Sequence, residues 1–256
     1  MEVKSYKKIR GNLYRVTLDD GNNYELYDDV ILKYELLIDK RIDEKKLTKI
    51  LEENEVLDAY YKALKYLGIK MRTRREVEFY LKKKDLSSKA IKKAIDKLEK
   101  EGYINSKMYV EAYVNDSINL GTNGPVKIKN ALLKLGIDEG DIDEYLNNVD
   151  SSTWTDKIEK FVLKKAKTNK VGISLFKNKV YSDLISLGYH SDDIKPVLEA
   201  FDLNTDDAFL KEADKVFGKL STKYSGTELK LRFKSKMFTK AFDSEKISDY
   251  LNKKGL

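Results

Sequence analysis

The spacing of hydrophobic residues changes once along the chain, near residue 40. Before that point, Leu13–Leu18 and Tyr24–Tyr27 are rich in β-branched and aromatic residues and are separated by a turn centred on Asp20-Gly21. Such segments around an Asp-Gly turn predict a β-hairpin. Because a two-stranded hairpin is only marginally stable in water, Lys4–Ile9 is expected to add a third strand.

After the hairpin, apolar residues recur at three- and four-residue intervals, which predicts amphipathic helices. Asp28 or Asp29 is expected to cap a short helix that runs to about Leu37, and Asp43 is expected to open a longer one. The buried stripe of the longer helix is predicted at Leu47, Ile50, Leu51, Leu57, Tyr61, Leu64 and Leu67.

One apolar pattern occurs four times, beginning at Ile91, Ile142, Ile194 and Ile247, with periods of 51, 52 and 53 residues. Each copy follows side chains that can cap a helix, and each is preceded by another amphipathic segment. The repeating unit is therefore predicted to be three short helices. The capping segments are Ser87-Ser88, Asp138 to Asp141, Ser191-Asp192-Asp193 and Asp243-Ser244-Glu245.

Two of the predicted helices end in Leu-Gly, at Gly136 and Gly188, where glycine can adopt the left-handed conformation of a helix stop. A three-helix unit of this length buries little core alone, so neighbouring units are expected to stack. We therefore expect a mainly α protein, with tandem three-helix repeats stacked into an elongated curved rod and a small N-terminal β-hairpin or meander. The expected parts are a β-rich extension with a short helix (1–42), a linking helix with repeat 1 (43–106), repeat 2 (107–153), repeat 3 (154–204) and repeat 4 (205–256).

Composition removes several classes of protein. Only 13 Gly and 2 Pro occur in 256 residues, which is too few for the turns of an all-β sandwich or barrel. The absence of cysteine excludes disulfides, thiolate zinc sites, iron–sulfur clusters and a cysteine nucleophile. No apolar run approaches the roughly 18 residues of a membrane span, and the first residues lack a secretory signal, so we expect a cytoplasmic protein without membrane contact.

The net charge of +7 is distributed unevenly. Residues 57–106 hold 14 basic and 7 acidic residues, whereas 107–153 have a net charge of −4 and 154–204 of +2. A local basic field attracts phosphate backbones or an acidic protein surface, although a solvated lysine-rich helix face is the alternative. Only seven of the 50 basic residues are arginine, which favours contact that does not depend on base sequence.

The candidate binding residues lie mostly in this basic stretch, on two successive predicted helices and the turn between them. They are Arg72, Arg74, Arg75, Lys82, Lys83, Lys84, Lys89, Lys92 and Lys93, with Lys127, Lys129 and Lys134 as a possible extension. Tyr80 is the one tyrosine expected to be exposed for base stacking, because most of the others lie at core spacing.

Nothing in the chain has the pattern of a catalytic site. His190 is the only histidine, and the phosphate-binding, nucleophile-elbow and dinucleotide motifs are absent. The acidic run from Asp138 to Glu144 is expected to complement a helix N-terminus and not to hold a metal. We therefore expect a protein that is not an enzyme and uses neither metal nor cofactor.

Two segments carry a resemblance to a known family. Residues 102–115 (GYINSKMYVEAYVN), followed by the pattern from Gly124-Pro125 to Leu135-Gly136-Ile137, resemble the RecX family of recombinase regulators. Upstream, Thr73-Arg-Arg-Glu-Val77 and Tyr80-Leu81 resemble the first repeat of that family. The β-rich start and the fourth unit resemble its longer form from Gram-positive bacteria. Asp85-Leu86 and Asn105-Ser106-Lys107 depart from the family pattern at local helix caps.

The resemblance implies a non-enzymatic regulator of homologous recombination and DNA repair. Such a protein binds RecA filaments on single-stranded DNA, in the helical groove of the filament, and modulates RecA, mostly by inhibiting it. Contact with single-stranded DNA is implied as well, with duplex DNA as an alternative, and we expect a monomer. Two alternatives stay open: a general nucleic-acid-binding helical protein that acts without RecA, and an adaptor whose repeats bind another protein.

Overall fold

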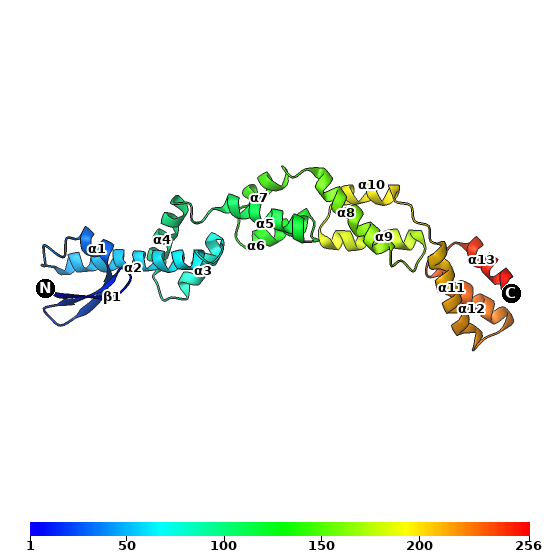
Figure 1. The fold of residues 1–256 in the computed structure, drawn as a ribbon, viewed down its shortest axis with the longest axis horizontal. Helices are drawn as coiled ribbons and strands as arrows, with labels where there is room; N and C mark the ends of the chain where they lie inside the picture. Colours follow the sequence, from blue (N-terminus) through cyan, green and yellow to red (C-terminus); the bar gives the residue numbers. More distant parts are fainter. The chain divides into compact units, whose positions relative to one another are not determined.

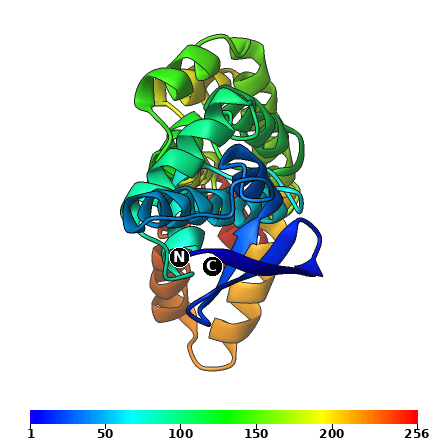
Figure 2. The same ribbon diagram turned by 90° about the vertical axis from the view of Figure 1, so that its left-hand side faces the viewer.

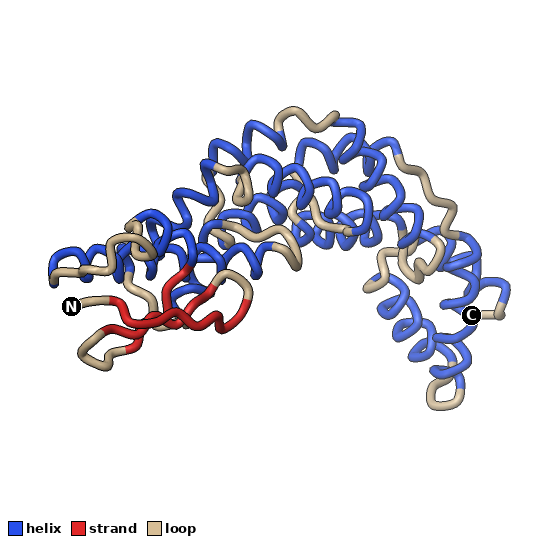
Figure 3. Tube along the Cα trace, turned by 60° about the vertical axis from the view of Figure 1, so that its left-hand side comes forward, coloured by secondary structure: helices blue, strands red, loops and turns tan.

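The computed structural model describes residues 1–256 and contains three strands and thirteen helices (Figure 1). The strands are confined to the N-terminal part, and the rest of the chain is helix and loop (Figure 3). The chain forms two compact units, Met1–Ala112 with Leu132–Ile142 and Tyr113–Ala131 with Asp143–Leu256. The prediction of a mainly helical protein with a small N-terminal sheet is confirmed.

The sheet consists of β1 (Val3–Arg10), β2 (Leu13–Leu18) and β3 (Asn23–Tyr27), which pair antiparallel in that order and lie in the foreground of Figure 2. All three predicted strands are thus confirmed. Gly21 turns the β2–β3 hairpin with a φ of 86°, a conformation that glycine adopts without strain. The buried face of the sheet includes Val16 and packs on residues of the following helices.

The first helix, α1 (Asp28–Lys33), is shorter than predicted. Its N-cap is Tyr27, and no side chain caps it, so the predicted cap by Asp28 or Asp29 is wrong. Both aspartates lie in the first turn, where their charge complements the helix dipole. The helix cannot extend to Leu37 because Glu35 has a φ of 53°, outside the helical region.

The first helix triplet consists of α2 (Glu44–Leu67), α3 (Arg74–Lys82) and α4 (Ser88–Lys100). Asp43 caps α2 as predicted, accepting a hydrogen bond from the Lys46 amide at 2.6 Å. The predicted stripe of α2 is only partly correct, since Leu51 is 37% exposed while Ala59 and Ala63 are fully buried. Alanines at these positions let α4 pack closely against α2, which apolar periodicity alone does not reveal.

Both shorter helices of this triplet begin with a side-chain cap. The Thr73 hydroxyl accepts the Glu76 amide at 3.2 Å, and the Glu76 carboxylate accepts the Thr73 amide at 2.9 Å, which completes a capping box. Ser87 caps α4 as predicted. Between the two helices, Asp85 takes a φ of 56°, a left-handed conformation that aspartate tolerates better than most residues.

Three further helix triplets follow in sequence. They are α5 (Ser106–Leu120), α6 (Pro125–Lys134) and α7 (Glu139–Leu146); α8 (Ser151–Ala166), α9 (Ile173–Leu187) and α10 (Ser191–Ala200); and α11 (Asp206–Ser221), α12 (Gly226–Phe238) and α13 (Ser244–Lys253). The repeat-marking isoleucines begin equivalent apolar patterns in the last helix of each triplet, and each is at most 2% exposed. The three-helix repeat is therefore confirmed.

The helix stops and caps of these triplets agree with the sequence at most positions. Gly136 and Gly188 have φ values of 79° and 87°, as predicted, and Asp243 caps α13. The predicted side-chain cap of α10 is wrong, because His190 is the N-cap and makes no such bond. The Ser191 hydroxyl instead lies 3.0 Å from the Tyr181 hydroxyl.

Within the second unit, two backbone hydrogen bonds tie the start of α6 and the residue before it to the end of α9. The Gly124 amide donates to the Leu187 carbonyl at 2.8 Å, and the Val126 amide donates to the Gly188 carbonyl at 3.0 Å. A Cβ atom on Gly124 would lie 2.5 Å from the Gly188 backbone, so only glycine fits at this crossing. None of the helices has the length and apolarity to cross a membrane.

Candidate nucleic-acid interface

The three predicted arginines are held by interactions within the protein. Arg72 pairs with Glu76 at 3.1 Å, and its guanidinium lies 4.4 Å from the centre of the Tyr66 ring. Its side chain is only 16% exposed, and its Nε is buried without a hydrogen-bond partner. Arg72 therefore has little surface to offer a ligand.

Arg74 joins α3 to α4. It pairs with Asp96 at 2.9 Å and with Glu99. Burial lowers the pKa of Arg74, but the bonds to these two carboxylates outweigh burial and raise it overall. Arg75 donates to the Lys134 carbonyl at 3.0 Å, and its aliphatic part covers Gly136.

The lysines at the end of α3 are more accessible. Lys82 pairs with Glu78 at 2.7 Å but remains 57% exposed. Lys83 lies 4.2 Å from the centre of the Phe79 ring, and Lys84 lies 5.3 Å from that of Tyr80. The ammonium groups of Lys83 and Lys84 are thus positioned by aromatic faces and, unlike that of Lys82, form no ion pair.

Tyr80 does not have the exposure expected of it. It is partly buried and stacks on Tyr66, with ring centres 4.1 Å apart and an angle of 8° between the rings. Phe79 is the exposed aromatic residue of α3, with 61% of its surface accessible. Together with Lys82 and Lys134, it lines a hollow of about 410 Å³.

The remaining predicted lysines differ in their surroundings. Lys89 pairs with Glu52 at 2.8 Å, whereas Lys92 and Lys93 are exposed on α4 and form no ion pair. Lys127 and Lys129, from the predicted extension of the basic stretch, belong to the second unit. There, Lys127 is exposed and Lys129 pairs with Asp143 at 2.7 Å.

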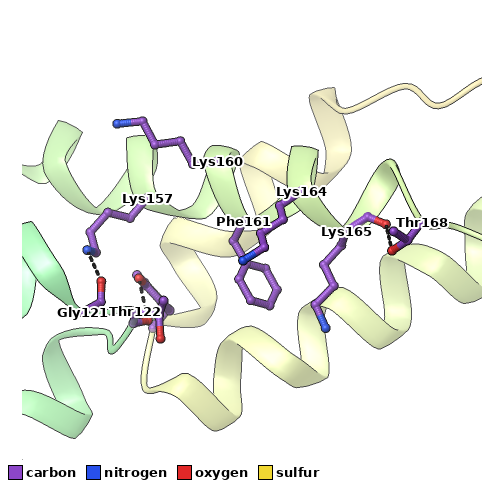
Figure 4. A pocket seen from close by; sticks show the side chains of 9 residues that line it. Gly121, Thr122, Lys157, Lys160, Phe161, Lys164, Lys165 and Thr168 are labelled. Carbon is purple, nitrogen blue, oxygen red and sulfur yellow. Dashed lines mark hydrogen bonds between the residues drawn. The ribbon is translucent and has the colours of Figure 1, made fainter.

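A second basic surface, on α8 and α9, was not predicted from the sequence. Lys157, Lys160, Lys164 and Lys165 of α8 line a hollow of about 530 Å³, together with Phe161 and the loop at Gly121 and Thr122 (Figure 4). In this view Lys157 turns toward Gly121, Lys160 points away from the hollow, and Lys164 and Lys165 extend along Phe161 toward α9.

Polar contacts shape one end of this hollow. Lys157 donates to the carbonyls of Ile118 and Gly121 at 2.5 and 2.8 Å, so it satisfies the C-terminus of α5. Burial, followed by the nearby charge of Lys160, lowers the pKa of Lys157. Tyr189 donates to the Thr122 carbonyl at 3.1 Å, and burial raises the pKa of its phenol to about 12.

A weak signal for this second surface exists in the sequence. Lys157, Lys160 and Lys164 follow the three- and four-residue spacing that puts side chains on one helix face. A net charge of only +2 over residues 154–204 conceals it, because acidic residues elsewhere in the same segment cancel the total.

Comparisons with known proteins point to one family. The family model described as the first three-helix domain of RecX matches residues 59–98. The regulatory protein RecX of Streptococcus agalactiae serotype III is 31% identical over 254 residues, which cover 97% of each chain. The regulatory protein RecX of Bacillus cytotoxicus is 31% identical over 264 residues, covering 99% of this chain and 96% of that protein.

Solved structures show the same fold. A crystal structure of regulatory protein RecX superposes with a TM-score of 0.69 at 24% identity, over 77% of this chain and 98% of that one. RecX from Lactobacillus salivarius gives a TM-score of 0.55 at 30% identity, over 57% of this chain and 96% of that one. From the near-complete similarity to curated relatives, the matching first domain and the shared helical fold, it follows that this chain belongs to the RecX family of regulatory proteins.

Proposed function

We propose that this protein is a non-catalytic regulator of RecA that binds RecA filaments on single-stranded DNA and mostly restrains their activity. The observation that carries the proposal is the 31% identity to curated regulatory RecX proteins over 97% of the chain. The repeated three-helix units support it further, because repeat proteins present extended surfaces to large partners. The proposed place of binding is the helical groove of the filament.

Within the first helix triplet, the lysines are the proposed contacts. Lys82, Lys83 and Lys84 are accessible at the end of α3, and exposed Phe79 lies beside them. Lys92 and Lys93 add two unpaired charges on α4. Lysine contacts of this kind attract phosphate or carboxylate groups without reading a base sequence.

The arginines have a different proposed task. Arg72 and Arg74 are engaged with carboxylates of the same triplet. Releasing these bonds for a ligand would remove the ion pairs of Glu76 and Glu99, which are both partly buried, and this costs free energy. We therefore assign Arg72 and Arg74 to holding α3 in place, and the lysines to binding.

The first experiment compares two forms of the same DNA. The protein is titrated onto fluorescently labelled single-stranded DNA, bare or coated with RecA and a slowly hydrolysed nucleotide, at about 0.15 M salt, where weak charge attraction is screened. Tighter binding to the coated strand supports the proposal. Equal or tighter binding to bare DNA contradicts it and favours a nucleic-acid-binding protein that acts without RecA.

A charge-reversal variant tests the assignment of residues. Replacing Lys82, Lys83 and Lys84 with Glu is expected to weaken filament binding and inhibition of RecA at least tenfold, because contacts to phosphate or acidic side chains become repulsive. The matched control replaces Lys211, Lys215 and Lys219 of α11 with Glu, which changes the net charge equally at three exposed positions. Equal loss in both variants would mean that only net charge matters.

A further inference from the structure

The basic surface of the third helix triplet continues beyond the hollow of Figure 4. A second hollow, of about 430 Å³, adjoins the first and shares Lys165 and Thr168 with it. Both hollows are lined by residues of the second unit. Their lysines are Lys157, Lys160, Lys164, Lys165, Lys170 and Lys179, and the only carboxylate among the lining residues is Asp183.

Most of this positive charge is not neutralised within the protein. Lys165 pairs with Asp183 at 2.8 Å, and Lys157 is bonded to backbone carbonyls. Lys160 and Lys164 form no ion pair, and Lys170 and Lys179 likewise form none. Four free ammonium groups along one surface create a field that attracts a polyanion.

An aromatic side chain lies beside part of this positive charge. Phe161 lines the first hollow, and the Lys165 ammonium lies 5.2 Å from the centre of its ring. Lys164 lies beside the ring, and Lys160, one helical turn earlier and about 6 Å along the axis, borders the hollow with its ammonium group turned outward (Figure 4). Proteins that bind single-stranded nucleic acid combine basic side chains with exposed aromatic rings. The basic side chains contact the phosphates of the strand, and an unpaired base stacks on the ring.

We propose that the α8–α9 surface, defined by Lys160, Phe161, Lys164, Lys170 and Lys179, binds a segment of single-stranded nucleic acid without regard to its sequence. A duplex is a poorer fit, because its bases are paired and cannot stack on Phe161. No arginine lines either hollow, so the surface offers no bidentate hydrogen bonds that could distinguish one base from another. This site needs no RecA and stands apart from the filament contacts assigned to the first triplet.

The test uses the full chain and a fluorescein-labelled twelve-residue oligothymidylate, with no RecA present. The double substitution Lys160→Gln and Lys164→Gln is expected to weaken binding about tenfold at 0.15 M salt. It is also expected to make the slope of log K against log salt less negative by about 1.4, because each phosphate contact on a single strand contributes about 0.7. Both lysines are exposed and unpaired, so circular dichroism and the melting temperature should not change.

The matched control is Lys215→Gln with Lys219→Gln on α11. These residues have the same four-residue spacing and exposure, make no ion pair and line neither hollow. The control is expected to change affinity less than twofold. Equal affinities for the wild type and the α8 double variant, or equal losses in the α8 and α11 variants, would overturn the proposal. Restoring the charge with Lys160→Arg and Lys164→Arg should restore binding.

Two further measurements identify the ligand class. Phe161→Leu keeps an apolar side chain but removes the ring, and is expected to weaken oligothymidylate binding five- to tenfold with the salt slope unchanged. A labelled decamer of glutamate is expected to bind at least tenfold more weakly than the oligonucleotide. If the peptide binds equally well and Phe161→Leu has no effect, the surface accepts any polyanion and the assignment to single-stranded nucleic acid is wrong.

Discussion

The first and third helix triplets differ in how much of their positive charge is paired with carboxylates. Residues 57–106 have a net charge of +7, yet Arg72 and Arg74 are paired with carboxylates of the same stretch and Lys89 is paired with Glu52 of α2. Residues 154–204 have a net charge of only +2, yet Lys160 and Lys164 are unpaired and border the same hollow. Net charge along the sequence therefore says little about where charge is free to bind.

The two regions are also held together differently. Side-chain bonds such as the Thr73–Glu76 capping box and the Arg74 ion pairs fix α3 in the first triplet. Around the α8–α9 surface, backbone contacts at Gly124 and Gly188 hold the neighbouring loop. Substitutions at these structural contacts should therefore lower stability in both regions, through side-chain bonds in the first triplet and through backbone packing in the second unit.

The largest expected effect is at Gly188. In Gly188→Ala, the new Cβ would lie 2.6 Å from the Lys127 backbone nitrogen at a φ of +87°, so about 3 kcal/mol of unfolding free energy should be lost. Gly136→Ala is the matched control, since its Cβ would meet only the flexible Arg75 side chain, and about 1 kcal/mol is expected. Urea denaturation measures the unfolding free energy of both variants. Equal losses would show that backbone packing does not distinguish Gly188 from Gly136.

The next effect is expected at Thr73, which is 3% exposed. Thr73→Val removes the cap of α3 and the hydrogen bond that the hydroxyl donates to the Leu135 carbonyl at 3.0 Å. A loss of about 1 to 2 kcal/mol in unfolding free energy is expected, because a cap and a buried acceptor both lose their partner. Thr73→Ser, which retains the hydroxyl, should lose less than half as much in the same denaturation experiment.

Arg74→Gln is expected to cost about 1 kcal/mol of stability, a modest figure because water screens the partly exposed pairs with Asp96 and Glu99. Its affinity for RecA-coated DNA should stay within twofold of the wild type. Denaturation and anisotropy on the same sample check both values. Unchanged stability with a tenfold loss of binding would assign Arg74 to the ligand and contradict the division between arginines and lysines.

The smallest effect concerns Lys89. Its hydrogen bond and charge lower the pKa of Glu52 from the ordinary value of 4.5. A lowered carboxyl pKa stabilises the fold above pH 4.5, and this contribution disappears as the pH falls through the lowered value. In Lys89→Gln, carboxyl NMR titration should show the Glu52 pKa returning toward 4.5, with DNA affinity unchanged. A Glu52 pKa that does not move would mean that the pair is absent in solution.

Much of the fold could be predicted from the sequence because its signals are local. The Asp-Gly turn, the spacing of the repeated isoleucines and the Leu-Gly stops each depend on a few neighbouring residues. Leu51 and Tyr80 were misjudged because their exposure depends on partners distant in sequence or on stacking, as between Tyr66 and Tyr80. Periodicity describes a helix face but not what covers it.

The candidate sites were less predictable for a related reason. A count of basic residues cannot tell that Arg74 meets Asp96 and Glu99, since those pairs form only when α3 packs on α4. Nor can it show that Lys165 and Lys179 line one hollow from two different helices. The free charge of each surface is a property of tertiary packing.

The central claim, that unpaired lysines and not local net charge determine nucleic-acid contact, is tested most directly by acetylation footprinting. The protein is treated with an acetylating reagent at low concentration, with and without the twelve-residue oligothymidylate, so that each lysine reacts only in part. Mass spectrometry then compares the extent of acetylation of each lysine in the two samples. The account predicts strong protection at Lys160 and Lys164 and little change at Lys89, Lys215 and Lys219. Protection of Lys89 with unchanged reactivity at Lys160 and Lys164 would contradict it.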